Sequence, residues 1–387
     1  MFNKKELINL EDFEIISKIG EGSYADVYLV KQIKKNQNLN QFFAMKVLDK
    51  NTLFNKSDSL PNINFHFALN EKNFLQNLSY KEIDFLPSLK YSFQNEKNIF
   101  MITQFYQGGE LSYHLNKVGR FNEKASRFYL AQLILILEYL HSNNILYRDL
   151  KPENVLLGLD GYLNLIDFGL CTFIDNNNLY NQNLNNIYSF NINNIKLGTP
   201  QYMSPELIKE NKLHFKNDIW SLGIILYQLL IGVCPFDSNN TENIYNDICN
   251  NYNKIEYPFY ISEPAKKLLK GLITDENKRL SLEEIKKSDF FKDFNWEDLM
   301  NKKIKAPFIP KIKNNYDNKY FISREVDMNK LVDEKYENNN NYDLDENLEE
   351  NHLITMKYVI DFYFNYSQIK SLSSSSLSTV DNEINEL

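Results

Sequence analysis

The feature that most constrains the fold is a change of pattern along the chain. Up to about residue 105, apolar residues gather in short strand-like runs such as FEIISKIG, ADVYLV and FFAMKVLD, and one helical pattern over residues 66–79 interrupts them. Residues 123–141 carry a long helical apolar stripe, and helices dominate from there to about residue 291. A β-rich part followed by a larger helical part predicts an α+β, bilobal fold with a cleft between the lobes.

Composition narrows the classes of protein that fit. The chain has 387 residues, of which 43% are apolar, enough for a sizeable core in two lobes. Its net charge of −8 argues against nucleic acid as the main partner, because phosphate backbones favour basic surfaces. Cys171, Cys234 and Cys249 have no paired or metal-like spacing, so we expect free thiols in a reducing compartment.

One apolar stretch resembles a membrane span. Residues 219–236 are almost continuously apolar and near the lower length limit for crossing a bilayer. The stretch contains Ser221 and Gln228, and Asp218 and Asp237 lie on either side of it. We therefore predict a buried helix and no transmembrane segment.

Other segments say little about function. Residues 51–64, 175–194 and 336–350 are rich in Asn and are expected to be exposed insertions or loops. Residues 1–10 lack the apolar core of a signal peptide, so we expect a cytoplasmic or nuclear protein.

A Gly-rich turn joins the first two predicted strands. It reads Gly20-Glu21-Gly22-Ser23-Tyr24-Ala25-Asp26-Val27. Because glycine has no Cβ, the backbone N–H groups of such a turn can approach phosphate oxygens closely. Alone the motif is weak evidence, since an ordinary hairpin can look the same, and Ala25 stands where a third glycine is usual.

Two charged residues follow the turn at a suitable distance. Lys46 ends the strand-like sequence Ala44-Met45-Lys46, and Glu71 lies in the helical segment 66–79. A single Lys in a strand is normally a solvated surface charge. After a Gly-rich turn, however, a Lys–Glu pair can hold the α- and β-phosphates of a nucleotide.

The next two motifs decide the family resemblance. The first is Tyr147-Arg148-Asp149-Leu150-Lys151-Pro152-Glu153-Asn154, and thirteen residues later comes Asp167-Phe168-Gly169. In order and spacing they match the catalytic loop and the metal-binding motif of protein kinases, with Tyr in place of the commoner His. The chain resembles this family over residues 13–291.

The resemblance implies a serine/threonine kinase that uses Mg-ATP and gives each motif residue a role. Asp149 would accept or orient the proton of the substrate hydroxyl, and Lys151 would neutralise charge on the γ-phosphate. Asn154 and Asp167 would supply oxygen ligands to two Mg²⁺ ions. Thr199, which would lie beside Asp149, favours Ser or Thr over Tyr as the acceptor.

Later motifs extend the resemblance. Gly198-Thr199-Pro200 and Ser204-Pro205-Glu206 are similar to the end of the activation segment, with Ser204 for the usual Ala. In this family Arg279 would be the partner of Glu206 in a buried ion pair.

The same resemblance implies a nucleotide pocket. Adenine would lie between Val27 and Ala44 on one side and Leu156 on the other, with Thr103 as gatekeeper. The residues expected to contact the nucleotide are Ile19, Gly20, Glu21, Gly22, Ser23, Tyr24, Ala25, Val27, Ala44, Lys46, Thr103, Gln104, Tyr106, Glu110, Leu156 and Phe321.

Within the kinase family, the sequence is similar to the AGC group (protein kinases A, B, C and G). Three features of the kinase core show this similarity: the Tyr-Arg-Asp form of the catalytic loop, FYQGGEL at 105–111 and GRFNEKASRFYLAQL at 119–133. Two motifs of the tail add to it: PFIP at 307–310 and DNKYF at 317–321. In this group the tail wraps over the small lobe, which would bring Phe321 to the adenosine. Further on, Tyr363-Phe364-Asn365-Tyr366-Ser367 resembles the hydrophobic motif, although overlapping aromatics blur its register.

These motifs imply domain boundaries. We expect an extension over 1–12, a small lobe over 13–105, a large lobe over 106–291 and an AGC tail over 292–387. Because the kinase core starts near residue 13, we expect no lipid-binding or cyclic-nucleotide-binding domain before it in this chain.

By resemblance, two carboxylates imply a substrate preference. Glu110 and Glu153 match the positions that receive a substrate Arg three residues before the target hydroxyl. Gln228 stands where many relatives carry a further acid, so a preference for a second Arg is in doubt. We expect protein substrates with basic residues before the Ser or Thr, and a monomeric enzyme.

Regulation departs from the AGC pattern. The activation-loop Thr expected three residues before Gly198 is Ile195. Either the loop is ordered without a phosphate, or Ser189 substitutes, or intrinsic activity is weak. An upstream kinase acting on Ser189 or Ser367 is a further expectation.

Two rival interpretations carry less weight. A pseudokinase scaffold would bind nucleotide without transferring phosphate, but such proteins usually lack one of the six motif residues, and all six are present here: Lys46, Glu71, Asp149, Lys151, Asn154 and Asp167. A small-molecule phosphotransferase is disfavoured by the long segment between Asp167 and Glu206, which is typical of kinases that act on proteins.

Overall fold

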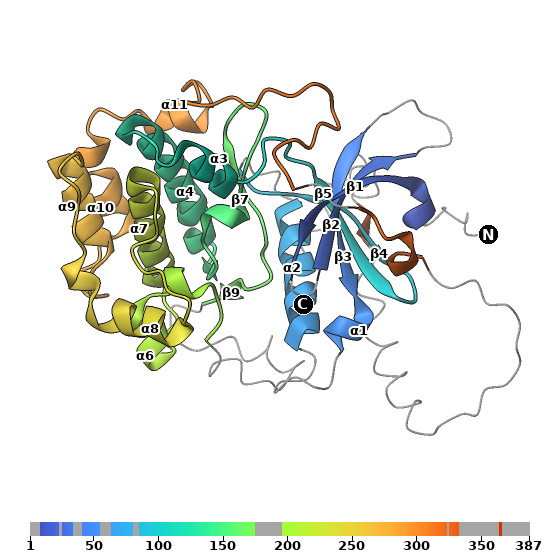
Figure 1. Cartoon of the computed structure of the whole chain (residues 1–387), viewed down its shortest axis with the longest axis horizontal. Helices are drawn as coiled ribbons and strands as arrows, with labels where there is room; N and C mark the ends of the chain where they lie inside the picture. The colour runs from blue at the N-terminus through green and yellow to red at the C-terminus, as the bar shows by residue number, and fades with distance from the viewer. Residues whose placement is uncertain are drawn as a thin grey trace, which may run out of the picture. The chain divides into compact units, whose positions relative to one another are not determined.

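The computed structural model describes residues 8–22, 25–33, 41–54, 63–79, 85–174, 196–322 and 325–332, and the backbone of 364–365. The chain divides into two compact units (Figure 1). Unit 1 combines Met1–Ile83, Pro87–Phe105 and Asn314–Leu387, and unit 2 combines Asp84–Leu86 with Tyr106–Lys313. The predicted fold class is confirmed, with a β-sheet in the first unit and mostly helices in the second.

Unit 1 is built on an antiparallel sheet in the order β1-β2-β3-β5-β4-β10. Its strands are β1 (Phe13–Glu21), β2 (Ala25–Gln32), β3 (Phe42–Asp49), β4 (Leu89–Gln94), β5 (Asn98–Gln104) and β10 (Phe364–Asn365). Its helices are η1 (Leu10–Asp12), α1 (Lys50–Leu53), α2 (Ile63–Ser79) and η7 (Met328–Lys330). The helix predicted over 66–79 thus begins one turn earlier than its apolar pattern indicated.

The strand register sorts side chains onto two faces of the sheet. Val27 lies opposite Lys46 and Ala44 opposite Thr103, so these four residues share one face. The alternate residues point to the other face, where an apolar cluster forms. It contains Phe13, Tyr28, Val30, Phe43, Met45, Val47, Phe93, Phe100, Ile102 and Leu331.

The C-terminal tail completes this cluster. Leu331 is only 1% exposed within it, although the sheet strands that surround it come from the first hundred residues or so. Asn95 Nδ2 donates to the Leu331 carbonyl (2.8 Å) and Asn98 Nδ2 to the Lys330 carbonyl (2.7 Å), which fixes the tail backbone at the β4–β5 turn. The core of unit 1 is therefore built from both ends of the chain.

Unit 2 is mostly helical. Its helices are α3 (Leu111–Val118), α4 (Glu123–Ser142), α6 (Pro205–Glu210), α7 (Lys216–Ile231), α8 (Thr241–Asn250), α9 (Glu263–Leu272), α10 (Leu282–Lys286) and α11 (Trp296–Met300). Short antiparallel pairs are β6 (Ile145–Leu146) with β9 (Thr172–Phe173) and β7 (Val155–Leu157) with β8 (Leu163–Leu165). Single 3₁₀ turns are η2 (Pro152–Asn154), η4 (Pro200–Tyr202), η5 (Tyr252–Lys254) and η6 (Asp289–Phe291).

Helix α7 is the predicted buried helix. Nearly all of its residues are buried, which explains why its sequence is apolar on every side. It ends at Gly232, whose φ of +99° favours glycine and whose Cβ, if present, would lie 2.1 Å from the Gly119 carbonyl oxygen. None of the helices in the described part of the chain has the length and apolar character needed to cross a bilayer.

The start of the tail runs along unit 2. Tyr162 Oη donates to the Ile304 carbonyl (2.6 Å), and Lys302 pairs with Asp160 at 3.2 Å. A Cβ on Gly161 would lie 2.1 Å from the Phe308 carbonyl oxygen, so only glycine lets the tail pass this closely.

We predict that Leu331→Ala destabilises unit 1. A buried leucine truncated to alanine should cost about 2–5 kcal/mol of unfolding free energy, because it removes apolar contacts and leaves a cavity. Urea unfolding together with hydrogen exchange at the β4 and β5 amides measures the loss. The neighbouring Val332 is 45% exposed, so Val332→Ala is the matched control and should change little. Equal stability of the two variants would contradict the role given to Leu331.

Candidate active site

In unit 1, the Lys46 and Glu71 side chains form an ion pair. Lys46 Nζ lies 2.6 Å from Glu71 Oε2, and both side chains are largely buried. Strand β3 supplies the lysine and helix α2 the glutamate. A buried pair of this kind holds both side chains in fixed positions, since separating them would leave a charge without compensation.

The Gly-rich turn lies at the end of β1 and the start of β2. The Gly22 N–H donates to the Ala25 carbonyl at 2.7 Å, which joins the two ends of the turn. Ser23 and Tyr24, two predicted site residues, lie outside the described residues. A Cβ on Gly20 would approach the Val27 Cβ to 3.3 Å, so a larger residue would crowd the neighbouring strand.

Two predicted pocket residues of unit 1, Thr103 and Gln104, lie on β5. Thr103 shares the sheet face of Val27, Ala44 and Lys46. Gln104 ends the strand, and the ring of the next residue, Phe105, lies 5.5 Å from the ring of Phe321.

Phe321 therefore comes from the tail to the end of β5. Asn318 Nδ2 donates to Ser17 Oγ at 2.8 Å and holds this part of the tail on β1. Its predicted contact with adenosine stays a prediction, as do the roles of Ile19, Glu21, Tyr106 and Leu156.

In unit 2, Asp149 is the centre of a closed polar network. Its Oδ1 accepts from the Thr199 N–H (3.0 Å) and from Thr199 Oγ1 (2.7 Å). Its Oδ2 lies 2.7 Å from Lys151 Nζ, and Lys151 also donates to Thr199 Oγ1 at 2.8 Å. Thr199 was predicted beside Asp149 although fifty residues separate the two in sequence, and the structure brings them together.

Asn154 and Asp167 carry the predicted metal ligands. Asn154 Nδ2 donates to the Asp149 backbone carbonyl and to Asp149 Oδ2, both at 2.9 Å, which turns the amide oxygen away from Asp149. Asp167 has a φ of +63°, a backbone conformation that is uncommon outside glycine. An amide oxygen and a carboxylate are the hard donors that Mg²⁺ prefers, so the donor set fits the ion.

Within the described ranges, no group of three or more His, Cys, Asp or Glu side chains is arranged to hold a metal ion. A magnesium ion that arrives with nucleotide phosphates needs only one or two protein ligands.

A buried carboxylate whose role the sequence did not reveal positions the catalytic loop. Asp218, in the first turn of α7, accepts from the Arg148 N–H at 2.9 Å and from the Tyr147 N–H at 3.0 Å. His141 Nε2 lies 2.8 Å from its Oδ2. Asp218 is fully enclosed, so it fixes the backbone just before Asp149.

The family described as "Protein kinase domain" matches residues 13–291. The chain belongs to the protein kinase family.

Named relatives agree with the AGC resemblance, which is confirmed. This kinase is 35% identical over 321 residues to the RAC family serine/threonine-protein kinase homolog of Dictyostelium discoideum, covering 81% of this chain and 65% of the relative. It is 37% identical over 322 residues to Protein kinase 2 of the same organism, covering 82% and 61%. It is 34% identical over 339 residues to serine/threonine-protein kinase sgk-1 of Caenorhabditis elegans, covering 85% and 68%. The kinase thus spans less than two thirds of the length of the two Dictyostelium relatives.

Two carboxylates of unit 2 lie near the network around Asp149. Burial raises the pKa of Glu153, the charges of Glu110 and Asp149 raise it further, and Lys151 opposes the change. Glu110 accepts a hydrogen bond from Ser112 Oγ at 2.7 Å, which holds its carboxylate at the start of α3. Glu110 and Glu153 thus form an acidic site next to Asp149.

A neutral pair borders this acidic site. Tyr202 Oη donates to Gln228 Oε1 at 2.7 Å, and Tyr202 is close enough to Glu153 for the carboxylate to raise its pKa, although burial is the larger cause. Gln228 therefore contributes a dipole here and no charge.

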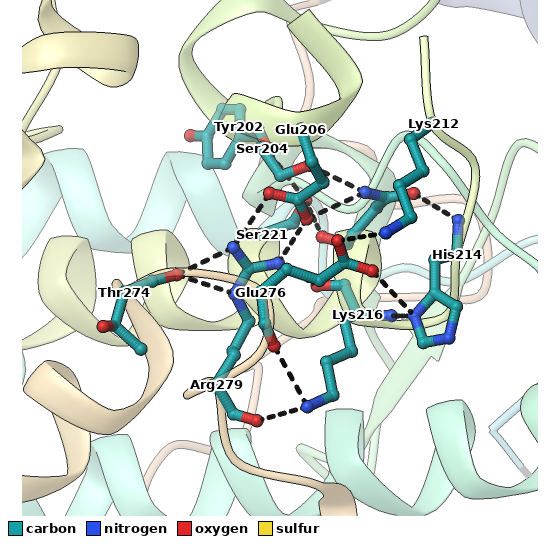
Figure 2. A network of polar contacts seen from close by, with 11 residues as sticks. Tyr202, Ser204, Glu206, Lys212, His214, Lys216, Ser221, Thr274, Glu276 and Arg279 are labelled. Atoms are coloured by element: carbon teal, nitrogen blue, oxygen red, sulfur yellow. Dashed lines mark hydrogen bonds and ion pairs between the residues drawn. The ribbon is translucent and has the colours of Figure 1, made fainter. Parts of the chain in front are cut away.

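The predicted ion pair of Glu206 and Arg279 is confirmed and fully enclosed (Figure 2). Nη1 and Nη2 of Arg279 donate to the two oxygens of Glu206 at 2.5 and 3.1 Å. Further donors of Arg279 reach the Thr274 and Lys216 carbonyls. Burial alone would raise the pKa of Glu206, but the hydrogen bonds and charge of Arg279 outweigh it and lower the pKa.

We predict that Arg279→Met destabilises the kinase by about 3–5 kcal/mol, because it leaves a buried carboxylate without its partner. The double variant Glu206→Gln, Arg279→Met should be more stable than the single one. Thermal unfolding at neutral pH measures both. Lys267→Met, which removes an exposed pair with Asp289, is the control and should leave the midpoint unchanged. A single variant as stable as the control would contradict the assignment.

Proposed function

We propose that this chain is an active protein serine/threonine kinase that transfers the γ-phosphate of Mg-ATP to Ser or Thr in protein substrates. The observation that carries the proposal is the closed network of Asp149, Lys151, Thr199 and Asn154. It supports the chemistry because the four side chains hold one another in fixed positions, and phosphoryl transfer depends on positioning and electrostatics.

The reaction forms a bond between the substrate hydroxyl oxygen and the γ-phosphorus and breaks the bond from that phosphorus to the β,γ-bridging oxygen. Asp149 orients the hydroxyl and takes its proton. The Lys151 ammonium offsets charge on the phosphoryl oxygens. Thr199 holds both side chains, which limits their freedom before the substrate arrives.

Magnesium has a defined place in this proposal. The Asn154 amide oxygen and the Asp167 carboxylate would hold it, and it would supply positive charge beside the phosphates when bound. These two donors are compatible with one bound Mg²⁺ or with two. We propose two ions because of the resemblance to the kinase family.

The acidic site supports a substrate preference. We propose that Glu110 and Glu153 receive an Arg three residues before the target hydroxyl, since a guanidinium would neutralise two carboxylates that otherwise repel each other. The neutral Gln228 beside Glu153 offers no charge to a second Arg, so we expect no strong preference for one.

Regulation of the enzyme stays a prediction. Ile195, Ser189 and Ser367 lie outside the described residues, so the action of an upstream kinase and the ordering of the activation loop rest on the sequence alone. The same holds for the domain boundaries, for a cytoplasmic or nuclear location and for a monomeric state.

We predict that Asp149→Asn lowers kcat by roughly 100-fold or more, because an amide cannot accept the hydroxyl proton. Phosphate transfer from Mg-ATP to a peptide with Arg three residues before a Ser is the measurement. Asp289→Asn, an exposed change in the same unit, is the control and should retain full activity. Nucleotide binding without transfer by the wild type would replace the proposal with a pseudokinase.

A second prediction concerns pH and substrate choice. Because the pKa of Glu153 is raised, it becomes neutral at a higher pH than the ordinary value of 4.5 would give. The KM for an Arg-containing peptide should therefore rise as the pH falls toward that raised pKa, while the KM for the matching Ala peptide stays flat.

Glu153→Gln should remove this pH dependence and raise the KM for the Arg peptide about 10-fold or more at neutral pH, with little change in kcat. Glu297→Gln, an exposed acid in the same unit, is the control. Equal pH profiles for the Arg and Ala peptides would exclude Glu153 from substrate binding.

A further inference from the structure

A buried lysine lies behind the Gly-rich turn and is not used by the site described above. Lys18, in β1, has a side chain only 11% exposed. Its Nζ lies 2.9 Å from Asp26 Oδ1 in β2 and 3.6 Å from Glu21 Oε1 at the end of β1. Tyr28 Oη completes the group by donating to Asp26 Oδ2 at 3.3 Å.

The strand register explains why a cation is needed at this point. Glu21 and Asp26 are directly opposite each other across the hairpin. Like charges in this position destabilise a strand pair. Lys18 contacts both carboxylates, so it converts a repulsion at the mouth of the turn into an attraction.

The same lysine lies at an irregularity in the ladder. The register shifts between Lys18 and Gly20, so Lys18 pairs with Tyr28 but Gly20 already pairs with Val27. A bulge of this kind interrupts the ladder and leaves the register beyond it less firmly set. The bond from Lys18 to Asp26 joins a residue before the bulge to a residue beyond it on the partner strand.

Lys18, Asp26 and Tyr28 lie on the side of the sheet away from Val27 and Lys46. Asp26 and Tyr28 alternate with Val27, and Val27 shares its face with Lys46. Lys18 and Asp26 therefore affect the phosphate-binding turn through the backbone and not by contact with the nucleotide.

A third acid, Asp327 of the tail, acts on the same group. Burial raises the pKa of Tyr28 to about 12, and the charges of Asp26 and of Asp327 in the tail contribute. Lys18 thus faces Asp26 and Glu21 directly, with Asp327 near the Tyr28 hydroxyl. Its loss would remove the positive charge that contacts Glu21 and Asp26 behind a turn that has to accept phosphate.

We propose that Lys18 and Asp26 are positioning residues for nucleotide binding, because their ion pair fixes the register of the Gly20–Gly22 backbone across the bulge and neutralises the acidic mouth of the turn. The proposal rests on the nucleotide use proposed above. Lys18 has the larger role, since it contacts two carboxylates, Glu21 and Asp26.

The test is a double-mutant cycle on nucleotide affinity. Lys18→Met should raise the Kd for Mg-ADP and the KM for ATP about tenfold, and Asp26→Asn about threefold, with kcat at saturating ATP and the peptide KM nearly unchanged. Adding Asp26→Asn to Lys18→Met should improve binding relative to Lys18→Met alone, because it removes one of the two facing carboxylates. Titration calorimetry with Mg-ADP and steady-state kinetics provide the readouts.

The same hairpin offers a matched control. Lys31 and Glu14 form a Lys–acid pair at the other end of β1 and β2, at 3.9 Å and with side chains 33% and 54% exposed. Glu14→Gln should leave the Kd for Mg-ADP unchanged. If Glu14→Gln weakened Mg-ADP binding as much as Asp26→Asn, the effect would be a general one on the hairpin, and the proposal would be overturned.

The remaining outcomes distinguish a failure of the role proposed for Lys18 from a failure of the proposed kinase function. Additive effects of the two changes, or a lowered unfolding midpoint with unchanged nucleotide affinity, would reduce Lys18 to a structural residue and overturn the proposal. A wild type that binds Mg-ADP but transfers no phosphate would contradict the kinase function, while the Kd series would still decide the role of Lys18. A wild type that binds no nucleotide would contradict both.

Discussion

The candidate active site of unit 2 depends on one buried carboxylate. Asp218 accepts the N–H groups of Tyr147 and Arg148 and lies against His141. Arg148 has a φ of +75°, which costs free energy in a residue with a side chain, so this backbone needs a partner that holds it. Asp218 provides that partner from the first turn of α7, where the helix dipole also favours a negative charge.

Asp218 is the first of several contacts that together fix the positions of Asp149 and its partners. The loop that it holds presents Asp149, and Asp149 in turn holds Thr199, Lys151 and Asn154. The segment that carries Thr199 continues into Glu206, which is paired with Arg279. A few charged groups with internal partners therefore determine where the reacting groups lie, and apolar packing of α7 provides the rigid base.

Local motifs in the sequence predicted the parts of this arrangement that they encode. The motifs predicted that Thr199 lies beside Asp149 and that Glu206 pairs with Arg279, and the structure shows both contacts. The roles predicted for Asp149, Asn154 and Asp167 stay predictions. The two-lobe fold class was predicted from the change of hydrophobic period near residue 105. Helix α7 was recognised because its length and flanking acids fitted a buried helix better than a membrane span.

The features that the sequence did not predict share a physical cause. The contacts of Asp218 with Tyr147 and Arg148 join residues about 70 positions apart, and the Asn95 contact with Leu331 joins residues 236 positions apart. No local pattern marks such pairs. The bulge beside Lys18 was also not predicted, because it is defined by the pairing of β1 with β2, which the sequence of one strand does not give.

The burial of Leu331 has a consequence for how the chain is made. Strands β1 to β5 leave the ribosome long before residues 314–332, and nearly all of unit 2 is synthesised in between. At roughly 5–20 residues per second, the sheet would wait on the order of ten seconds or more for its last core residue. During that interval unit 2, whose chain is nearly continuous, can fold first. The apolar face that Leu331 later covers is thus left open to water on the nascent sheet during that interval.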